Sequence, residues 1–129
     1  MLDTDVSSYI IKNRSAALQA RMERLARTDL CVSVITRAEL IFGVERVRHL
    51  RYGRPIVEQF LRRVAVLAWD ESAADHYGVV RSQLEAMGQP IGELDTLIAA
   101  HALAVNAVLV TNNLRHFSRV PGLKIEHWN

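Results

Sequence analysis

Residues 94–113, LDTLIAAHALAVNAVLVTNN, decide the fold class, because a long apolar stretch of helical character is followed almost at once by a short run rich in β-branched residues. A helix is predicted over residues 94–105 and a strand over residues 108–111. The same alternation recurs along the chain, with further strands predicted at 1–4, 30–34, 65–67 and 124–127. Short apolar strands separated by helices are typical of a parallel sheet covered by helices, so the sequence predicts an α/β fold.

Helices are predicted between these strands, over residues 7–12, 16–26, 36–47, 55–64 and 71–87. In the third of them, Thr36 and Glu39 have the spacing of a capping box, so Thr36 is predicted to cap that helix. We find no repeat, no low-complexity tract and no linker rich in Pro, Gly or Ser. A length of 129 residues therefore predicts one domain over residues 1–129.

The composition excludes several classes of protein. Half of the residues are hydrophobic and 23% are charged, which is typical of a globular chain and not of a disordered one. No apolar run approaches the roughly 20 residues that span a bilayer, so no contact with a membrane is expected. Asp3 stands where a signal peptide would carry basic residues, and Cys31 is the only cysteine. We expect a cytoplasmic protein without an internal disulfide.

Arginine dominates the basic residues. The chain has fourteen Arg and two Lys, with a net charge of only +2, and residues 46–63 hold six Arg against one acid, Glu58. Arginine suits phosphate and carboxylate partners, so Arg46, Arg48, Arg51 and Arg54 are candidate contacts for a nucleic acid or an acidic protein segment. The alternative, equally weighted, is the solvated outer face of a helical hairpin.

Acidic and amide side chains follow the predicted strands or open the predicted helices. Ligands of open α/β sheets bind beyond the carboxyl ends of the strands, where these elements meet. The residues expected there are Asp3, Thr4, Asp5, Glu39, Asp95, Thr111, Asn112 and Asn113. Singly, each acid has a structural explanation, such as a helix cap or a first-turn acid that the helix dipole favours. Together, their placement favours a functional site.

Clustered carboxylates repel one another and remain ionised only with a cation among them. The two lysines, Lys12 and Lys124, are not placed near the cluster by the predicted order of elements. Oxygen ligands without His or Cys suit Mg²⁺ or Mn²⁺. Such an ion can neutralise charge on a phosphate during in-line attack, so the pattern suggests hydrolysis of a phosphodiester.

Four segments resemble VapC-type toxins, which are PIN-domain ribonucleases. They are MLDTD (1–5), SVITRAELIFGVE (33–45), IGELDTLIAAHAL (91–103) and VLVTNNLRHFSRVPGLKIEHW (108–128), and their order and spacing also match. The resemblance implies a three-layer sandwich, with a central parallel sheet of four or five strands between helices. It also implies an endoribonuclease that depends on Mg²⁺ or Mn²⁺.

The resemblance further implies roles for single residues. Asp3 and Asp95 would bind the metal directly, and Glu39 would bind it directly or through water. Thr111 would orient an acid, and Asn113 would be the fourth polar residue. Many PIN domains have Asp at this fourth position, which leaves open whether one or two ions bind.

Two further acids have no settled role. Asp5 stands where the family usually has Asn, and it either joins the site or caps the first helix, with the cap favoured. Glu93 either joins the site or is a solvated loop acid. The five histidines lack the spacing of a metal site and are expected at the surface or the edge of the core (His49, His76, His101, His116 and His127).

The partners implied by the resemblance are a VapB-type antitoxin, an RNA substrate and a second copy of the chain in a homodimer. Transfer RNA is the first substrate to test, while the cleavage position is not encoded in any motif that we find. Operator DNA would be bound only through the antitoxin. The alternative is a PIN-like binding module with little turnover, which acts with an antitoxin as a co-repressor.

Overall fold

The computed structural model describes residues 1–47 and 53–128. Along the chain the elements are α1 (Thr4–Ile11), α2 (Ala16–Glu23), the 3₁₀ turn η1 (Arg27–Asp29), β1 (Cys31–Ser33), α3 (Val34–Arg46), α4 (Gly53–Leu61), β2 (Ala65–Leu67), α5 (Glu71–Ala86), α6 (Glu93–Ala104), β3 (Leu109–Val110), α7 (Leu114–Phe117) and β4 (Ile125–Glu126). The predicted helices are all present, with ends shifted by three residues or fewer. The short helix α7 is an addition that the sequence pattern did not predict.

The strands pair in parallel, but in two small sheets. β1 pairs with β2, and β3 pairs with β4. Leu2 lies between the sheets: its N–H donates to the Cys31 carbonyl over 2.9 Å, and it forms a parallel bridge with Val110. The prediction of one continuous sheet of four or five strands is therefore only partly correct. The first predicted strand is reduced to a bridge because Asp3 already caps α1, and the backbone turns away there.

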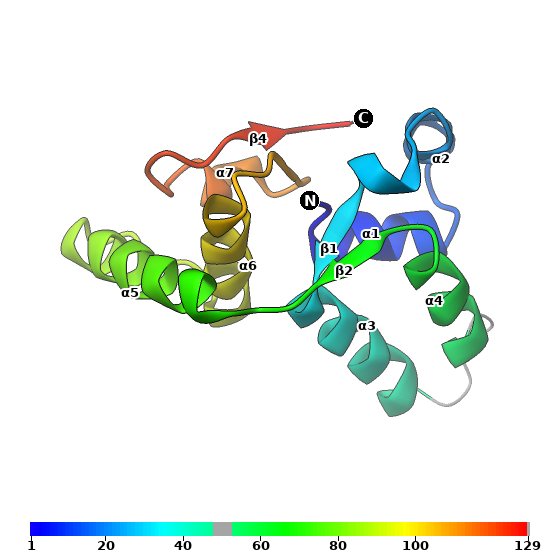
Figure 1. Ribbon diagram of the computed structural model, residues 1–129, viewed down its shortest axis with the longest axis horizontal. Coiled ribbons are helices and arrows are strands. Elements are labelled where there is room, and N and C mark those ends of the chain that lie inside the picture. Colours follow the sequence, from blue (N-terminus) through cyan, green and yellow to red (C-terminus); the bar gives the residue numbers. More distant parts are fainter. Residues whose placement is uncertain (48–52, 129) are drawn as a thin grey trace.

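Helices cover the strands on both sides. Figure 1 shows α5 and α6 on one side and α1, α3 and α4 on the other. Val6, Leu40 and Phe60 belong to an apolar cluster on the side of α1, α3 and α4. Leu84 and Ile98 belong to a second cluster, on the side of α5 and α6. The two clusters hold α1, α3 and α6 against the strands, so that the first turns of these helices lie near the carboxyl ends of the strands.

The start of α3 differs from the prediction. Ser33, not Thr36, is the N-cap, and its hydroxyl accepts from the Ile35 N–H over 3.1 Å. The predicted capping box of Thr36 and Glu39 is therefore wrong, because the helix begins almost one turn earlier. Ser33 Oγ also lies 2.7 Å from His101 Nδ1 of α6, and this contact joins the helix that carries Glu39 to the helix that carries Asp95.

The described part of the chain contains no helix that is both long and apolar enough to cross a membrane.

Candidate active site

Four elements meet at one pocket of about 170 Å³, which we call the acidic pocket. Asp3 stands at the end of the segment between the two sheets, Glu39 lies on α3, Asp95 lies in the first turn of α6, and Asn113 precedes α7. The side chains that line the pocket are those of Asp3, Thr4, Asp5, Glu39, Asp95, Asn113 and Phe117. The three acids predicted from the sequence therefore share one cavity, although they lie far apart in the chain.

Asp3 is the most buried of the acids, with only 4% of its surface exposed. Its Oδ1 accepts from the Val6 N–H over 2.8 Å, which makes Asp3 the N-cap of α1, and the Thr111 side chain also hydrogen-bonds to its carboxylate. Burial raises the pKa of Asp3 from its usual 3.8 to about 6, despite these two hydrogen bonds, and the charges of Asp5 and Asp95 raise it further. Among the described residues, no Lys or Arg lines the acidic pocket to offset the charge of Asp3.

Glu39 is held by a chain of hydroxyl groups. The Thr4 hydroxyl donates to Glu39 Oε1 over 2.6 Å, and Thr4 Oγ1 also lies 3.0 Å from Thr36 Oγ1. Because Thr4 has one hydroxyl proton and gives it to Glu39, Thr36 must donate to Thr4. Burial raises the pKa of Glu39, the Thr4 hydrogen bond opposes this, and Asp95 and Asp5 add to the rise.

Asp95 belongs to the first turn of α6, after the N-cap residue Gly92. Burial raises its pKa, the nearby His116 opposes this rise, and Asp5 adds to it. The pKa values of all three acids thus move in the same direction. Burial is the largest cause each time, and neighbouring carboxylates add to it.

The donor chemistry of the acidic pocket fits a hard divalent cation, because its polar lining consists of carboxylate, hydroxyl and amide groups, and neither Lys nor Arg lines it among the described residues. As the side chains stand, no three His, Cys, Asp or Glu residues in the described part of the chain are grouped as they would be around a metal ion. Asp3 and Glu39 instead accept hydrogen bonds from their own neighbours.

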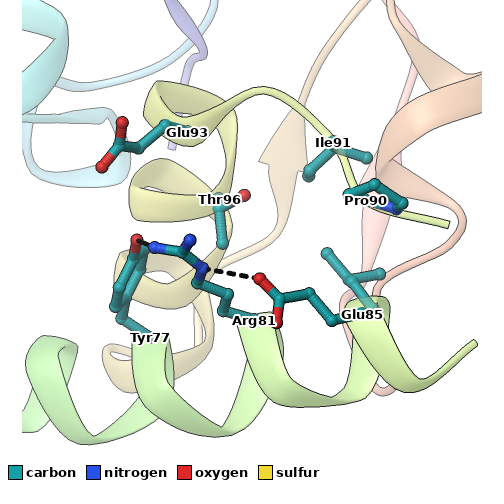
Figure 2. Close-up of a pocket in the computed structure, with 8 residues that line it drawn as sticks. Tyr77, Arg81, Glu85, Pro90, Ile91, Glu93 and Thr96 are labelled. Carbon is teal, nitrogen blue, oxygen red and sulfur yellow. Dashed lines mark hydrogen bonds and ion pairs between the residues drawn. The ribbon is translucent and has the colours of Figure 1, made fainter. Parts of the chain in front are cut away.

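Asp5 and Glu93, the two acids whose roles the sequence left open, lie in different pockets. Asp5 lies in the first turn of α1 and lines the acidic pocket, so the prediction that it caps α1 is wrong: the cap is Asp3, two residues earlier. Glu93 lines a different pocket of about 130 Å³ between α5 and the start of α6 (Figure 2). There Arg81 binds Glu85 over 3.0 Å and the Tyr77 hydroxyl over 3.0 Å, so that the charge of Glu85 is compensated.

The predicted basic contacts divide into three cases. Arg46 lines a groove of about 280 Å³ that shares Thr4, Asp5 and Glu39 with the acidic pocket. Arg54 pairs with Glu45 at 3.5 Å and with Glu58 at 3.6 Å. Arg48 and Arg51 lie outside the described residues. Of the described members of the predicted set, Arg46 is therefore the one beside the acids. Lys12 lines the same groove, so the expectation that neither lysine lies near the acids is wrong for Lys12, because Lys12 is the C-cap of α1, the helix that carries Asp5.

Sequence reasoning missed His116. Its Nδ1 lies 2.9 Å from Asn113 Nδ2, and its charge acts on Asp95. The spacing of three residues between Asn113 and His116 fits one helical turn and could have suggested the pair. Because no helix was predicted at this point, there was no reason to apply helical spacing there.

Residues 1–123 match the PIN domain family. The chain is 39% identical to the tRNA(fMet)-specific endonuclease VapC of Shigella flexneri, in an alignment that covers 100% of this chain and 97% of the other. It is 41% identical to the protein of the same name from Salmonella typhimurium, over 99% of this chain and 96% of that one.

Two solved structures have closely similar folds. The crystal structure of VapBC2 from Rickettsia felis, bound to a DNA fragment from its promoter, matches with a TM-score of 0.93 and 35% identity, over 100% of this chain and 98% of the other. The structure of DNA-bound VapBC from Salmonella typhimurium matches with a TM-score of 0.93 and 41% identity, over 100% and 97% of the two chains.

Proposed function

The chain belongs to the PIN-domain family of VapC-type ribonucleases, and from this membership we propose that it is a toxin that hydrolyses RNA phosphodiesters with the help of Mg²⁺ or Mn²⁺. The proposal includes residues 1–129 acting as one domain. The observation that supports it most is the acidic pocket, where Asp3, Glu39 and Asp95 gather and where no Lys or Arg of the described ranges 1–47 and 53–128 contributes to the lining.

In this proposal Asp3 and Asp95 bind the cation directly, and Glu39 binds it directly or through water. When bound, the cation supplies the positive charge that offsets charge building up on the phosphate during in-line attack by water. The raised pKa values of the three acids support this assignment. They mean that the ionised carboxylates are destabilised in the pocket, and a bound cation would stabilise them.

The protein's own groups hold these carboxylates in position. The Val6 N–H and the Thr111 side chain fix Asp3, and the Thr4 hydroxyl fixes Glu39. Thr111 also accepts from the Asn113 N–H over 2.9 Å, so one hydroxyl joins the two sides of the pocket. We infer that Thr4 and Thr111 are positioning residues, which act on the substrate only through the acids.

We propose transfer RNA as the substrate, with the initiator tRNA first. Two relatives at about 40% identity over nearly the whole chain are named tRNA(fMet)-specific endonucleases. The groove that adjoins the acidic pocket carries Arg46, a side chain suited to a phosphate of the RNA backbone.

We further propose that a VapB-type antitoxin binds this chain, that the chain forms a homodimer, and that operator DNA is bound through the antitoxin. The similarity to DNA-bound VapBC structures from two species supports the antitoxin and the operator DNA as partners, and the homodimer is proposed from the family resemblance. A co-repressor role is compatible with ribonuclease activity, because the same toxin can be silent as an enzyme while it is bound to its antitoxin.

Removal of the metal tests the function directly. Purified protein is expected to cleave initiator tRNA with Mg²⁺ or Mn²⁺, to stop in excess EDTA, and to recover when the ion is restored. Product formation on denaturing gels measures this. Cleavage that continues unchanged in EDTA would refute the metal-dependent mechanism. No cleavage of total tRNA with either ion, together with intact operator binding by the antitoxin complex, would favour the co-repressor alternative.

Loss of the Thr4 hydroxyl is expected to weaken both fold and activity. In Thr4→Val the buried Thr36 hydroxyl loses its acceptor and Glu39 loses its donor, which costs about 1–3 kcal/mol of unfolding free energy. Cleavage should also slow, because Glu39 is no longer fixed. Urea unfolding and initial rates measure the two effects. Thr4→Ser, which keeps the hydroxyl, should remain close to the unchanged protein, and equal losses in both variants would contradict the role of the hydrogen bond.

A further inference from the structure

The one-turn helix α7 carries His116, which does not itself line the acidic pocket but contacts Asn113, a residue of its lining. Phe117 at its end is only 1% exposed, belongs to the core cluster of α5 and α6, and also lines the pocket. His116, one residue earlier, is half-buried. The backbone at His116 therefore adjoins an anchored residue, and its side chain contacts Asn113.

The hydrogen bond between Asn113 and His116 determines which ring nitrogen carries the proton. Asn113 Nδ2 lies 2.9 Å from His116 Nδ1, and an amide NH₂ group can only donate. When the ring is neutral, Nδ1 is then the acceptor and the hydrogen is on Nε2. Nε2 of His116 is thus a hydrogen-bond donor both in this neutral form and in the charged ring.

Two residues of the pocket lining interact with His116, namely Asn113 and Asp95. Asp95 is close enough for His116 to influence it electrostatically, and Asn113 is itself part of the pocket lining. The pocket is lined by four carboxylates, those of Asp3, Asp5, Glu39 and Asp95. These negative charges repel the phosphate of an approaching RNA. An N–H donor next to such acids is the kind of group that can orient a phosphate.

We propose that His116, oriented by Asn113, is a substrate-contacting residue whose Nε2–H donates to a non-bridging oxygen of the RNA phosphate at the acidic pocket. This inference rests on the proposed ribonuclease function and adds a residue that the sequence motifs did not single out. Asn113 then acts through His116, as a positioning residue and not as a fourth ligand of the cation.

Two variants of His116 separate the donor from the bulk of the ring. His116→Gln keeps an N–H donor at a similar distance from the backbone, whereas His116→Phe keeps a ring and loses the donor. A hydrogen bond to a charged group corresponds to a change of about 10- to 100-fold. We expect His116→Phe to lower kcat/KM for initiator tRNA by that factor, and His116→Gln to stay within about threefold of the unchanged protein.

A binding measurement without turnover distinguishes this inference from the proposed function. The dissociation constant for initiator tRNA is measured by fluorescence anisotropy in EDTA, where the proposed reaction cannot proceed. His116→Phe should bind the tRNA more weakly, and His116→Gln should bind it as the unchanged protein does. If the unchanged protein cleaves nothing, the ribonuclease proposal fails, and the tRNA dissociation constants alone decide the role of His116.

Three results would overturn the inference: no effect of His116→Phe on tRNA binding and cleavage, equal losses in His116→Gln and His116→Phe, or an effect of His116→Phe that follows a loss of folding in urea titrations.

The role of Asn113 is tested by a double-mutant cycle of Asn113→Ala and His116→Ala. If Asn113 acts through His116, the double variant should be no worse than His116→Ala alone. Additive losses would show that Asn113 acts independently.

Discussion

Replacing Asp95 with asparagine is expected to lower the rate of tRNA cleavage by at least about 100-fold, because outer-shell partners of metal ligands alone contribute about 10- to 100-fold. Asparagine has nearly the same shape, so the first turn of α6 and the lining of the acidic pocket should remain intact. What is lost is a negative charge that the proposed cation requires. Single-turnover cleavage of initiator tRNA in saturating Mg²⁺ measures the effect.

Glu93→Gln is the matched control for this prediction. Glu93 lies in the same first turn of α6, two residues before Asp95, but it lines the other pocket (Figure 2). The Glu93→Gln exchange removes one negative charge near the same helix terminus. Because Glu93 does not line the acidic pocket, the rate of cleavage should be nearly unchanged. Equal losses in Asp95→Asn and Glu93→Gln would mean that the negative charge of the turn, and not a ligand at Asp95, matters. Full activity of Asp95→Asn would exclude Asp95 from the site.

Replacing Asp3 with asparagine is expected to stabilise the protein in the absence of metal. The pKa of Asp3 is about 6 in the folded protein against a usual 3.8, so the folded form holds the proton more tightly than the unfolded form. Stability is therefore lost as the pH rises from about 4 to about 6, by about 3 kcal/mol in total. The neutral amide of the Asp3→Asn variant avoids this cost and caps α1 equally well, because Asn and Asp are similar N-caps.

Urea unfolding across this pH range, in EDTA and in Mg²⁺, measures the prediction. In EDTA the Asp3→Asn variant should match the unchanged protein near pH 4 and exceed its stability above pH 6. Mg²⁺ should stabilise the unchanged protein and have little effect on the variant. Asp70→Asn is the control, because Asp70 is also the N-cap of a helix but is exposed and lies outside the acidic pocket. A variant that is less stable than the unchanged protein at neutral pH would contradict the prediction.

The two predictions test different consequences of the same arrangement. Without a cation, ionisation of the acids in the pocket lowers the stability of the folded protein. With the proposed cation bound, the same ionised acids are needed as its ligands for cleavage. Asp3→Asn should therefore combine higher stability in EDTA with loss of cleavage in Mg²⁺. A structural role for the acid would instead make both properties worse, because the cap of α1 and the hydrogen bond from Thr111 would be weakened together.

The sequence by itself determined the order of helices and strands, apart from α7 and the first strand, and the convergence of Asp3, Glu39 and Asp95. Both follow from local patterns, since apolar periodicity defines the elements, and parallel strands bring their carboxyl ends to one edge. The resemblance of four segments to PIN-domain ribonucleases also needed nothing beyond the order of residues, and the family match over residues 1–123 confirms it.

Only the tertiary structure decided how each acid is held. The bond from Thr4 to Glu39 joins residues 35 positions apart, and the identity of the α1 and α3 caps depends on where the backbone leaves the strands. The place of His116 likewise required a helix too short to show periodicity. Local patterns of residues specify the helices and strands. Burial and the hydrogen bonds between elements depend instead on how these elements pack. Packing therefore determines the pKa of Asp3 and the position of His116.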